Sequence, residues 1–185
     1  MRTPKDFHSF SLVAQALHWT MAAMVLAMLG IGAAMVASLG WYHTLVAVHR
    51  PLGLAVLVLV MVRFIYRLWN PPPPLPATVS RVERIAATVS EFTLYALMFA
   101  LPLVGWGMMS ASRYPVVLFG SVYLPNILPH DVAVYAVLRK AHTVLAYALA
   151  LLILAHVGAV LFHTLVVRDG MLRRMWPRAR RGETA

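Results

Sequence analysis

Four histidines lie inside the apolar stretches of this 185-residue sequence, at His18, His49, His142 and His156. His142 and His156 are 14 residues apart in one uncharged segment. On a helix both would point the same way, about 21 Å apart along the axis. A histidine in lipid is costly and by default indicates a functional site. Two on one face, separated by most of the thickness of a bilayer, predict two stacked cofactors instead of one cluster.

Depth in the membrane pairs these four histidines. His18 comes about nine residues into the first apolar segment, and His156 about eleven residues before the end of the last, so both lie near one level. His49 and His142 share a level in the opposite half by the same count. A haem b takes two axial imidazoles from facing helices, and its flat macrocycle fits between the helices of a bundle. We therefore predict two non-covalent haems b, each with bis-histidine ligation.

Each histidine taken singly has another explanation, an interhelical hydrogen bond, but the matched depths of all four favour ligands. The remaining histidines are expected elsewhere. His8 and His43 lie near helix entries and are predicted to be interfacial, and His130 lies in a loop. His163 follows His156 by seven residues on the same helix face, which leaves it as an alternative inner ligand.

Arginine accompanies the histidines within the membrane zone. Arg63 lies 14 residues after His49, so the second segment repeats the spacing of the last one with a cation in the lower position. Arg63 could bind a propionate of the inner haem through its bidentate fork, or extend to the headgroups; Arg67 is expected to extend to them. Three cations beside the outer ligands could bind propionates, attract an anion, or simply mark the interface. They are Arg50, Arg139 and Lys140.

The elements that must position these residues are membrane spans. The chain is 61% hydrophobic and 12% charged, where a soluble domain carries about 25% charged residues. No Asp, Glu, Lys or Arg occurs in residues 7–49, 92–112 or 141–167. Each stretch can supply the roughly 20 residues of a spanning helix. The sequence therefore predicts an all-α integral membrane protein.

We expect a four-helix bundle, with both haems between the helices, as one domain over residues 1–185. The spans are predicted at about 9–37, 41–68, 91–110 and 132–167, with a basic cytoplasmic tail at 168–185. The run from Pro71 to Pro74 ends the second helix and forms a stiff linker. Residues 80–84 should start an interfacial helix that leads into the third span, and Asp131 should cap the fourth.

The basic residues set the orientation. The net charge is +10, but these residues flank apolar spans, which argues against nucleic acid and for a membrane. One side of the predicted bundle carries Arg2, Lys5, Arg63, Arg67, Arg81, Arg84, Arg168, Arg173, Arg174, Arg178, Arg180 and Arg181. The other carries only Arg50, Arg113, Arg139 and Lys140. The positive-inside rule then places both termini in the cytoplasm. The absence of cysteine excludes thiolate-bound haem and iron–sulfur clusters.

An ordered set of short motifs over nearly the whole chain resembles the bacterial cytochrome b561 family. The matching runs are Ala16-Leu17-His18-Trp19, His49-Arg50-Pro51-Leu52-Gly53, Leu101-Pro102-Leu103-Val104-Gly105-Trp106 and Leu172-Arg173-Arg174-Met175-Trp176-Pro177, together with His142 and His156. The resemblance implies a multi-pass protein of the bacterial inner membrane with two haems b, ligated as paired above. One branch of that family moves electrons from periplasmic superoxide to ubiquinone. Glu91 stands where members often carry histidine, so no role is carried over to it.

The leading hypothesis is a transmembrane electron carrier that exchanges electrons with the quinone pool and, as the resemblance implies, oxidises periplasmic superoxide. Two bis-histidine haems have no open coordination position, which favours outer-sphere electron transfer. An alternative is a cytochrome b anchor subunit that passes electrons between a partner dehydrogenase and quinone, docked by residues 113–131 or by the basic tail. A divalent-metal transporter is an alternative of another class. It would require carboxylates among the histidines, and only Glu91 lies near a span.

Overall fold

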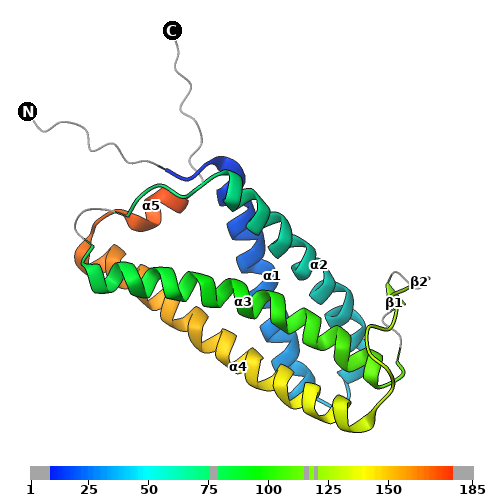
Figure 1. Cartoon of the computed structure of the whole chain (residues 1–185). Helices are drawn as coiled ribbons and strands as arrows, with labels where there is room; N and C mark the ends of the chain where they lie inside the picture. Colours follow the sequence, from blue (N-terminus) through cyan, green and yellow to red (C-terminus); the bar gives the residue numbers. More distant parts are fainter. Residues whose placement is uncertain (1–8, 76–78, 115–116, 119–120, 177–185) are drawn as a thin grey trace, which may run out of the picture.

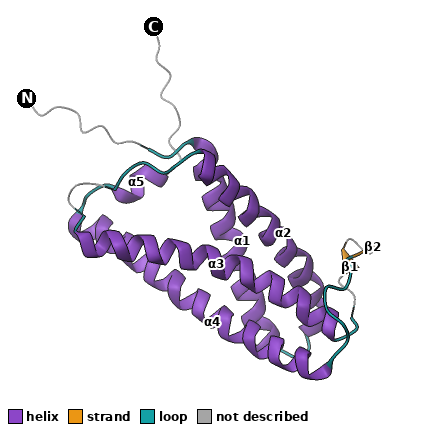
Figure 2. Cartoon of the chain, viewed as in Figure 1, coloured by secondary structure: helices purple, strands orange, loops and turns teal. Residues whose placement is uncertain are grey.

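The computed structural model describes residues 9–75, 79–114, 117–118 and 121–176. Four long helices form the body of the molecule: α1 (Leu12–Ala37), α2 (Tyr42–Trp69), α3 (Arg81–Ala111) and α4 (Val132–Phe162). A π-helical turn, η1 (His163–Val167), and a short helix, α5 (Met171–Met175), follow. Strands β1 (Val117–Leu118) and β2 (Val122–Tyr123) pair antiparallel in the α3–α4 loop, the one hairpin in the described part of the chain (Figure 2). Several sequence predictions lie outside the described residues, namely those for Arg2, Lys5, His8, Arg178, Arg180 and Arg181.

Each long helix is long and apolar enough to cross a membrane, which makes this a multi-pass membrane protein. Large apolar side chains cover the outside of the helices, as at Leu26, Val36 and Leu151. Such exposure suits a lipid solvent, whereas a soluble protein rarely tolerates so large an apolar surface. The predicted all-α four-helix membrane fold is thus confirmed.

Side-chain caps set where three of the helices begin. Ser11 Oγ accepts a hydrogen bond from the backbone of the first turn of α1, and Asp131 Oδ1 does the same for α4. Ser80 and Glu83 form a reciprocal capping box at the start of α3. Because of this box α3 begins at Arg81, within the residues 80–84 where an interfacial helix was expected to start, and it runs unbroken into the third span.

The bundle is built from two helix pairs. α1 packs along α2, α3 packs along α4, and α2 joins the pairs through α3 (Figure 1). Close backbone approach between α1 and α4 is sparse among the described residues. The main core gathers residues such as Met21, Val60 and Tyr95, whereas α4 contributes a single buried residue, Leu149. Leu149 lies seven residues from both His142 and His156, so the histidine face of α4 is also the face that packs against the core.

The ends of the described chain meet at one end of the bundle. We call this the terminal end; the opposite end, with the α1–α2 and α3–α4 connections, is the loop end. Phe10 N–H donates to the Arg174 carbonyl at 3.1 Å, and Arg174 Nη2 donates to the Pro74 carbonyl at 2.8 Å. Trp19 Nε1 donates to the Met175 carbonyl at 2.9 Å. α5 therefore links the start of α1 with the proline linker.

Candidate functional site

Two histidine pairs bridge the helix pairs. The ring centroids of His18 on α1 and His156 on α4 lie 6.5 Å apart, with the ring planes at 56°. Those of His49 on α2 and His142 on α4 lie 6.2 Å apart, at 67°. The structure thus brings together the same partners that membrane depth pairs in the sequence. Along α4 the two sites are separated by about 21 Å, the rise of 14 helical residues.

The spacing within each pair suits a shared metal ion. An imidazole nitrogen lies about 2 Å from a bound transition metal, so two rings on opposite sides of one ion have centroids about 6 Å apart. All four histidines are half-buried, and Nδ1 of His49 and of His142 are buried without a hydrogen-bond partner in the described structure. Buried polar atoms are rarely left unpaired in this way. Paired imidazoles of this kind are a ligand set for haem iron, so the residues present fit that group.

Glycines bring the neighbouring helices close to the outer pair, His49 and His142. A Cβ placed at Gly105 of α3 would lie 3.3 Å from His142 Cε1, tighter than most real contacts. A Cβ at Gly32 of α1 would lie 3.8 Å from His49 Cε1, an ordinary contact. Even a methyl group at Gly105 would therefore press on the His142 ring.

Arg63 points into the bundle at the inner pair. Its Nη2 lies 2.9 Å from Nδ1 of His18, and its Cζ lies 5.6 Å from the centre of the buried Tyr95 ring. A guanidinium only donates hydrogen bonds, so Nδ1 of His18 is the acceptor here. The guanidinium of Arg63 thus lies against His18 and Tyr95 inside the bundle.

The sequence led us to expect that Arg67 extends to the headgroups, but in the structure it forms an ion pair. Its Nη2 lies 2.7 Å from Oε2 of Glu91, an ion pair between α2 and α3 with side chains 28% and 35% exposed. The expectation failed because the sequence does not show that α3 places a carboxylate opposite this turn of α2.

The three outer cations carry uncompensated charge. Arg50 is half-buried and its Nε is buried without a hydrogen-bond partner. Arg139 and Lys140 are exposed on α4, within one turn of His142. None of the three takes part in either of the two ion pairs found in the described ranges. A positive field at the loop end follows from this arrangement.

The other described histidines have local roles. His43 is exposed near the start of α2. Nδ1 of His130 lies 2.7 Å from the carbonyl of the last residue of α3 and can donate to it. Nδ1 of His163 lies 2.7 Å from Oδ2 of Asp169. This pairing occupies one ring nitrogen of His163, and the ring that faces His18 is that of His156.

Sequence reasoning missed several residues around the inner pair. Tyr95 is buried one turn after Glu91, and Trp19 packs edge-on against both His18 and Trp176, with centroids 5.5 and 5.6 Å apart. The four-residue spacing of Glu91 and Tyr95 was the available signal, since it puts both on one helix face. Trp176 had no such signal, because its contact depends on how α5 folds back.

A transporter site would gather several metal-binding side chains. Within the described ranges no three histidine, aspartate or glutamate side chains come together in a way that could hold a metal ion. The intramembrane histidines lie as two separate pairs. This arrangement gives no support to the divalent-metal transporter.

Comparison with known proteins identifies the family. Residues 9–178 match the family of prokaryotic cytochrome b561. The chain is 30% identical over 170 residues to the Escherichia coli K12 protein "Cytochrome b561 homolog 2", which covers 90% of each protein. It is 30% identical over 133 residues to "Probable superoxide oxidase CybB" of Yersinia pestis, covering 72% of this chain and 75% of that protein. A third relative, E. coli "Cytochrome b561 homolog 1", is 34% identical over 134 residues, or 70% of this chain and 73% of the relative. A match over nearly the whole chain, with paired histidines between its helices, shows that this protein belongs to the prokaryotic cytochrome b561 family.

Proposed function

We propose that this protein carries electrons across the membrane through two haems b, from a donor at the loop end to a quinone. Membership of the cytochrome b561 family implies that it is a membrane electron-transfer protein that binds haem b. The proposal adds the number of haems and their ligands: His18 with His156, and His49 with His142. One observation carries it, the two histidine pairs at metal-sharing distance on separate levels of one bundle.

The role of the protein is to hold the four paired imidazoles, to set their surroundings and to limit the access of a substrate to the metal. When bound, the haem iron supplies one-electron chemistry. His18 with His156 and His49 with His142 would hold the two groups, and a substrate would then exchange electrons without binding the metal.

Arg63 has a consequence for the inner site. A histidine that binds a metal through Nε2 carries its proton on Nδ1. Nδ1 then cannot accept the hydrogen bond that Arg63 donates in this structure. Ligation by His18 through Nε2 would therefore release Arg63 to another acceptor, and a haem propionate is the carboxylate that such a site supplies. The half-buried cation suits this role because its charge is costly without a partner.

We propose superoxide as the donor and the loop end as the side it reaches. A relative named as a probable superoxide oxidase motivates the choice. Arg50, Arg139 and Lys140 provide uncompensated positive charge near the outer pair, and such a field raises the arrival rate of an anion. The count of basic residues supports a topology with both termini in the cytoplasm, so that the loop end faces the periplasm.

An anchor subunit for a partner dehydrogenase is the second candidate. The α3–α4 loop favours it, because it exposes large side chains, with Tyr114 66% and Tyr123 67% accessible. Exposed aromatic side chains are common at protein interfaces. Co-purification of a dehydrogenase together with failure of superoxide to reduce the protein would favour this candidate.

The deciding experiment is a pyridine haemochrome assay on the purified full chain, set against the protein concentration from amino-acid analysis. Two haems b per chain are expected. One haem or none would contradict the proposal. Anaerobic addition of superoxide should then produce the reduced spectrum, and added ubiquinone should restore the oxidised one.

A further inference from the structure

Arg63 and Trp19 both contact the ring of the inner ligand His18. Arg63 Nη2 lies 2.9 Å from Nδ1 of that ring, and the Trp19 ring meets it edge-on, with centroids 5.5 Å apart and planes at 80°. Neighbours of this kind orient metal-binding histidines. Ligation of His18 through Nε2 places a proton on Nδ1, so the hydrogen bond from Arg63 does not persist. Of the two neighbours, Trp19 is therefore the one whose contact with the ring remains.

Trp19 is itself held by α5. Its Nε1 donates to the Met175 carbonyl at 2.9 Å, and its ring meets that of Trp176 edge-on, with centroids 5.6 Å apart and planes at 78°. Edge-to-face packing at this separation is a favoured arrangement of aromatic rings. One hydrogen bond and one ring contact thus fix the position and the tilt of the indole. Neither involves a nitrogen of His18, so ligation leaves both contacts in place.

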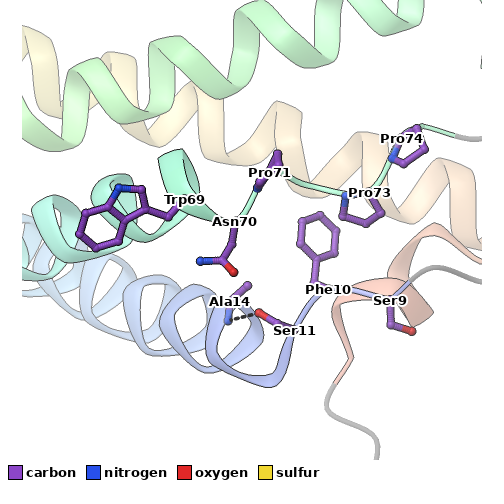
Figure 3. Close-up of a pocket in the computed structure, with 9 residues that line it drawn as sticks. All are labelled: Ser9, Phe10, Ser11, Ala14, Trp69, Asn70, Pro71, Pro73 and Pro74. Atoms are coloured by element: carbon purple, nitrogen blue, oxygen red, sulfur yellow. Dashed lines mark hydrogen bonds between the residues drawn. The ribbon is translucent and has the colours of Figure 1, made fainter.

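α5 is attached to the start of α1 and to the proline linker. Phe10 N–H donates to the Arg174 carbonyl at 3.1 Å, and Gln15 Nε2 lies 3.5 Å from the same carbonyl. The buried Arg174 side chain donates to the Pro74 carbonyl at 2.8 Å. Figure 3 shows Phe10 close to the proline linker, with which it lines an open cavity. Gln15 and Trp19 are four residues apart, so one face of α1 carries both side chains that bind α5.

Asp169 joins the start of α5 to η1. Its carboxylate is buried, with Oδ2 2.7 Å from Nδ1 of His163 and with Oδ1 accepting from Met171 N–H at 3.0 Å. α5 is therefore held at both of its ends. Trp176 comes directly after α5 and is 55% exposed, so the packing of the core does not account for its position. Its contact with the Trp19 ring does account for it.

We propose that Trp19 and Trp176 are positioning residues of the inner site: α5 holds Trp176, Trp176 holds Trp19, and Trp19 sets the plane of the His18 ring. The inference rests on the proposed function, in which His18 and His156 share one haem. Axial ligands are a means by which a protein tunes haem, and the angle between two imidazole planes sets the largest g-value of the oxidised iron. The outer pair lies against glycines of α1 and α3 instead, so the tryptophans act on one haem of the two.

The test is low-temperature electron paramagnetic resonance of the purified, oxidised holoprotein, in which the signal that His156→Ala abolishes identifies the inner haem. Trp176→Leu removes a ring that does not touch His18. It should broaden and displace the low-field line of the inner haem, with haem content unchanged. Trp176→Phe keeps an aromatic edge and should restore the wild-type line. Trp69→Leu is the matched control, since Trp69 is 79% exposed at the same end and has no ring contact in the described part of the chain.

A second variant removes the contact with the ligand itself. Trp19→Leu should broaden the same line at least as much as Trp176→Leu, and the double variant should add nothing further, because both residues act through one chain of contacts. Haem content is measured on every sample, so failure of the proposed function would appear as a low haem count in the wild type, before any variant is compared. An inner line unchanged in Trp176→Leu, or a change that Trp69→Leu or the outer haem shares equally, would overturn the positioning role.

Discussion

The two histidine pairs are alike in spacing and unlike in surroundings. The inner pair is set among charged and polar groups: Arg63 contacts His18, Tyr95 lies under Arg63, and the Arg67–Glu91 ion pair lies one turn away. The outer pair has unpartnered Nδ1 atoms, and glycines bring α1 and α3 against its rings. Charged and polar groups therefore surround the inner site, whereas close packing of helices surrounds the outer site. Changes that alter volume should affect the outer site, and changes that alter charge should affect the inner one.

Loss of a ligand should give the largest effect. His142→Ala should remove the outer haem and His156→Ala the inner haem, so each variant retains one haem of two. The haemochrome assay and reduced-minus-oxidised spectra would measure this, with His43→Ala as control because His43 is exposed and unpaired with another histidine. If His49→Ala altered the same spectral component as His156→Ala, the pairing would be wrong.

The second-largest effect is expected from a larger side chain at Gly105. Gly105→Val places a branched side chain against His142, where even a Cβ would be 3.3 Å away, and should remove most of the outer haem. Gly30→Val is the matched control, since nothing lies within 4 Å of a Cβ there. Haem content of the two variants would be compared after identical purification. Equal loss in both would show that the effect is general destabilisation instead of contact with the ring.

Charge at the loop end should affect the rate and leave haem content alone. Neutralising Arg50, Arg139 and Lys140 together as Gln should slow superoxide-driven reduction about tenfold at low salt, the lower range of electrostatic steering. Stopped-flow traces across ionic strength would show a steep salt dependence in the wild type and a flat one in the variant. A wild-type rate that does not change with salt would remove the steering role.

Charge at the inner pair should produce the smallest of these effects, a change in midpoint potential. Arg63→Gln removes a cation that favours the electron-rich reduced haem, so the inner potential should fall by about 60 mV if that charge is worth a factor of ten. Arg67→Gln should shift it less, because Glu91 already compensates Arg67. Spectroelectrochemical titration resolves the two haems. A larger change in the midpoint potential of the outer haem in Arg63→Gln would contradict the idea that charge acts mainly on the inner site.

Much of the fold follows from the sequence because membrane spans are defined by long uncharged runs. The spacing of histidines on a helix fixes their faces and levels, and these are enough to propose partners such as His18 and His156. The helix start predicted at residues 80–84 agrees with the structure, where the capping box of Ser80 and Glu83 begins α3 and the helix continues unbroken into the span.

The ion pair between Arg67 and Glu91 was beyond sequence reasoning. The distance from Arg67 to Glu91 depends on how α2 and α3 rotate against one another, which no periodicity in one segment determines. The same holds for α5, whose contact with Trp19 requires the chain to reverse after η1. Membrane depth matches residues at one level, as it does for the histidine pairs, whereas the rotation of one helix against another depends on packing.

The place of α4 in the chain has a consequence for biogenesis. Each histidine pair draws one ring from α4, the last long helix to leave the ribosome. With the proposed ligands, a nascent chain that ends before His142 has no complete site for either haem. Cofactor capture would then begin only when synthesis is nearly finished, and both haems would enter a bundle whose first three spans are already inserted. A chain truncated after α3 should reach the membrane and remain colourless.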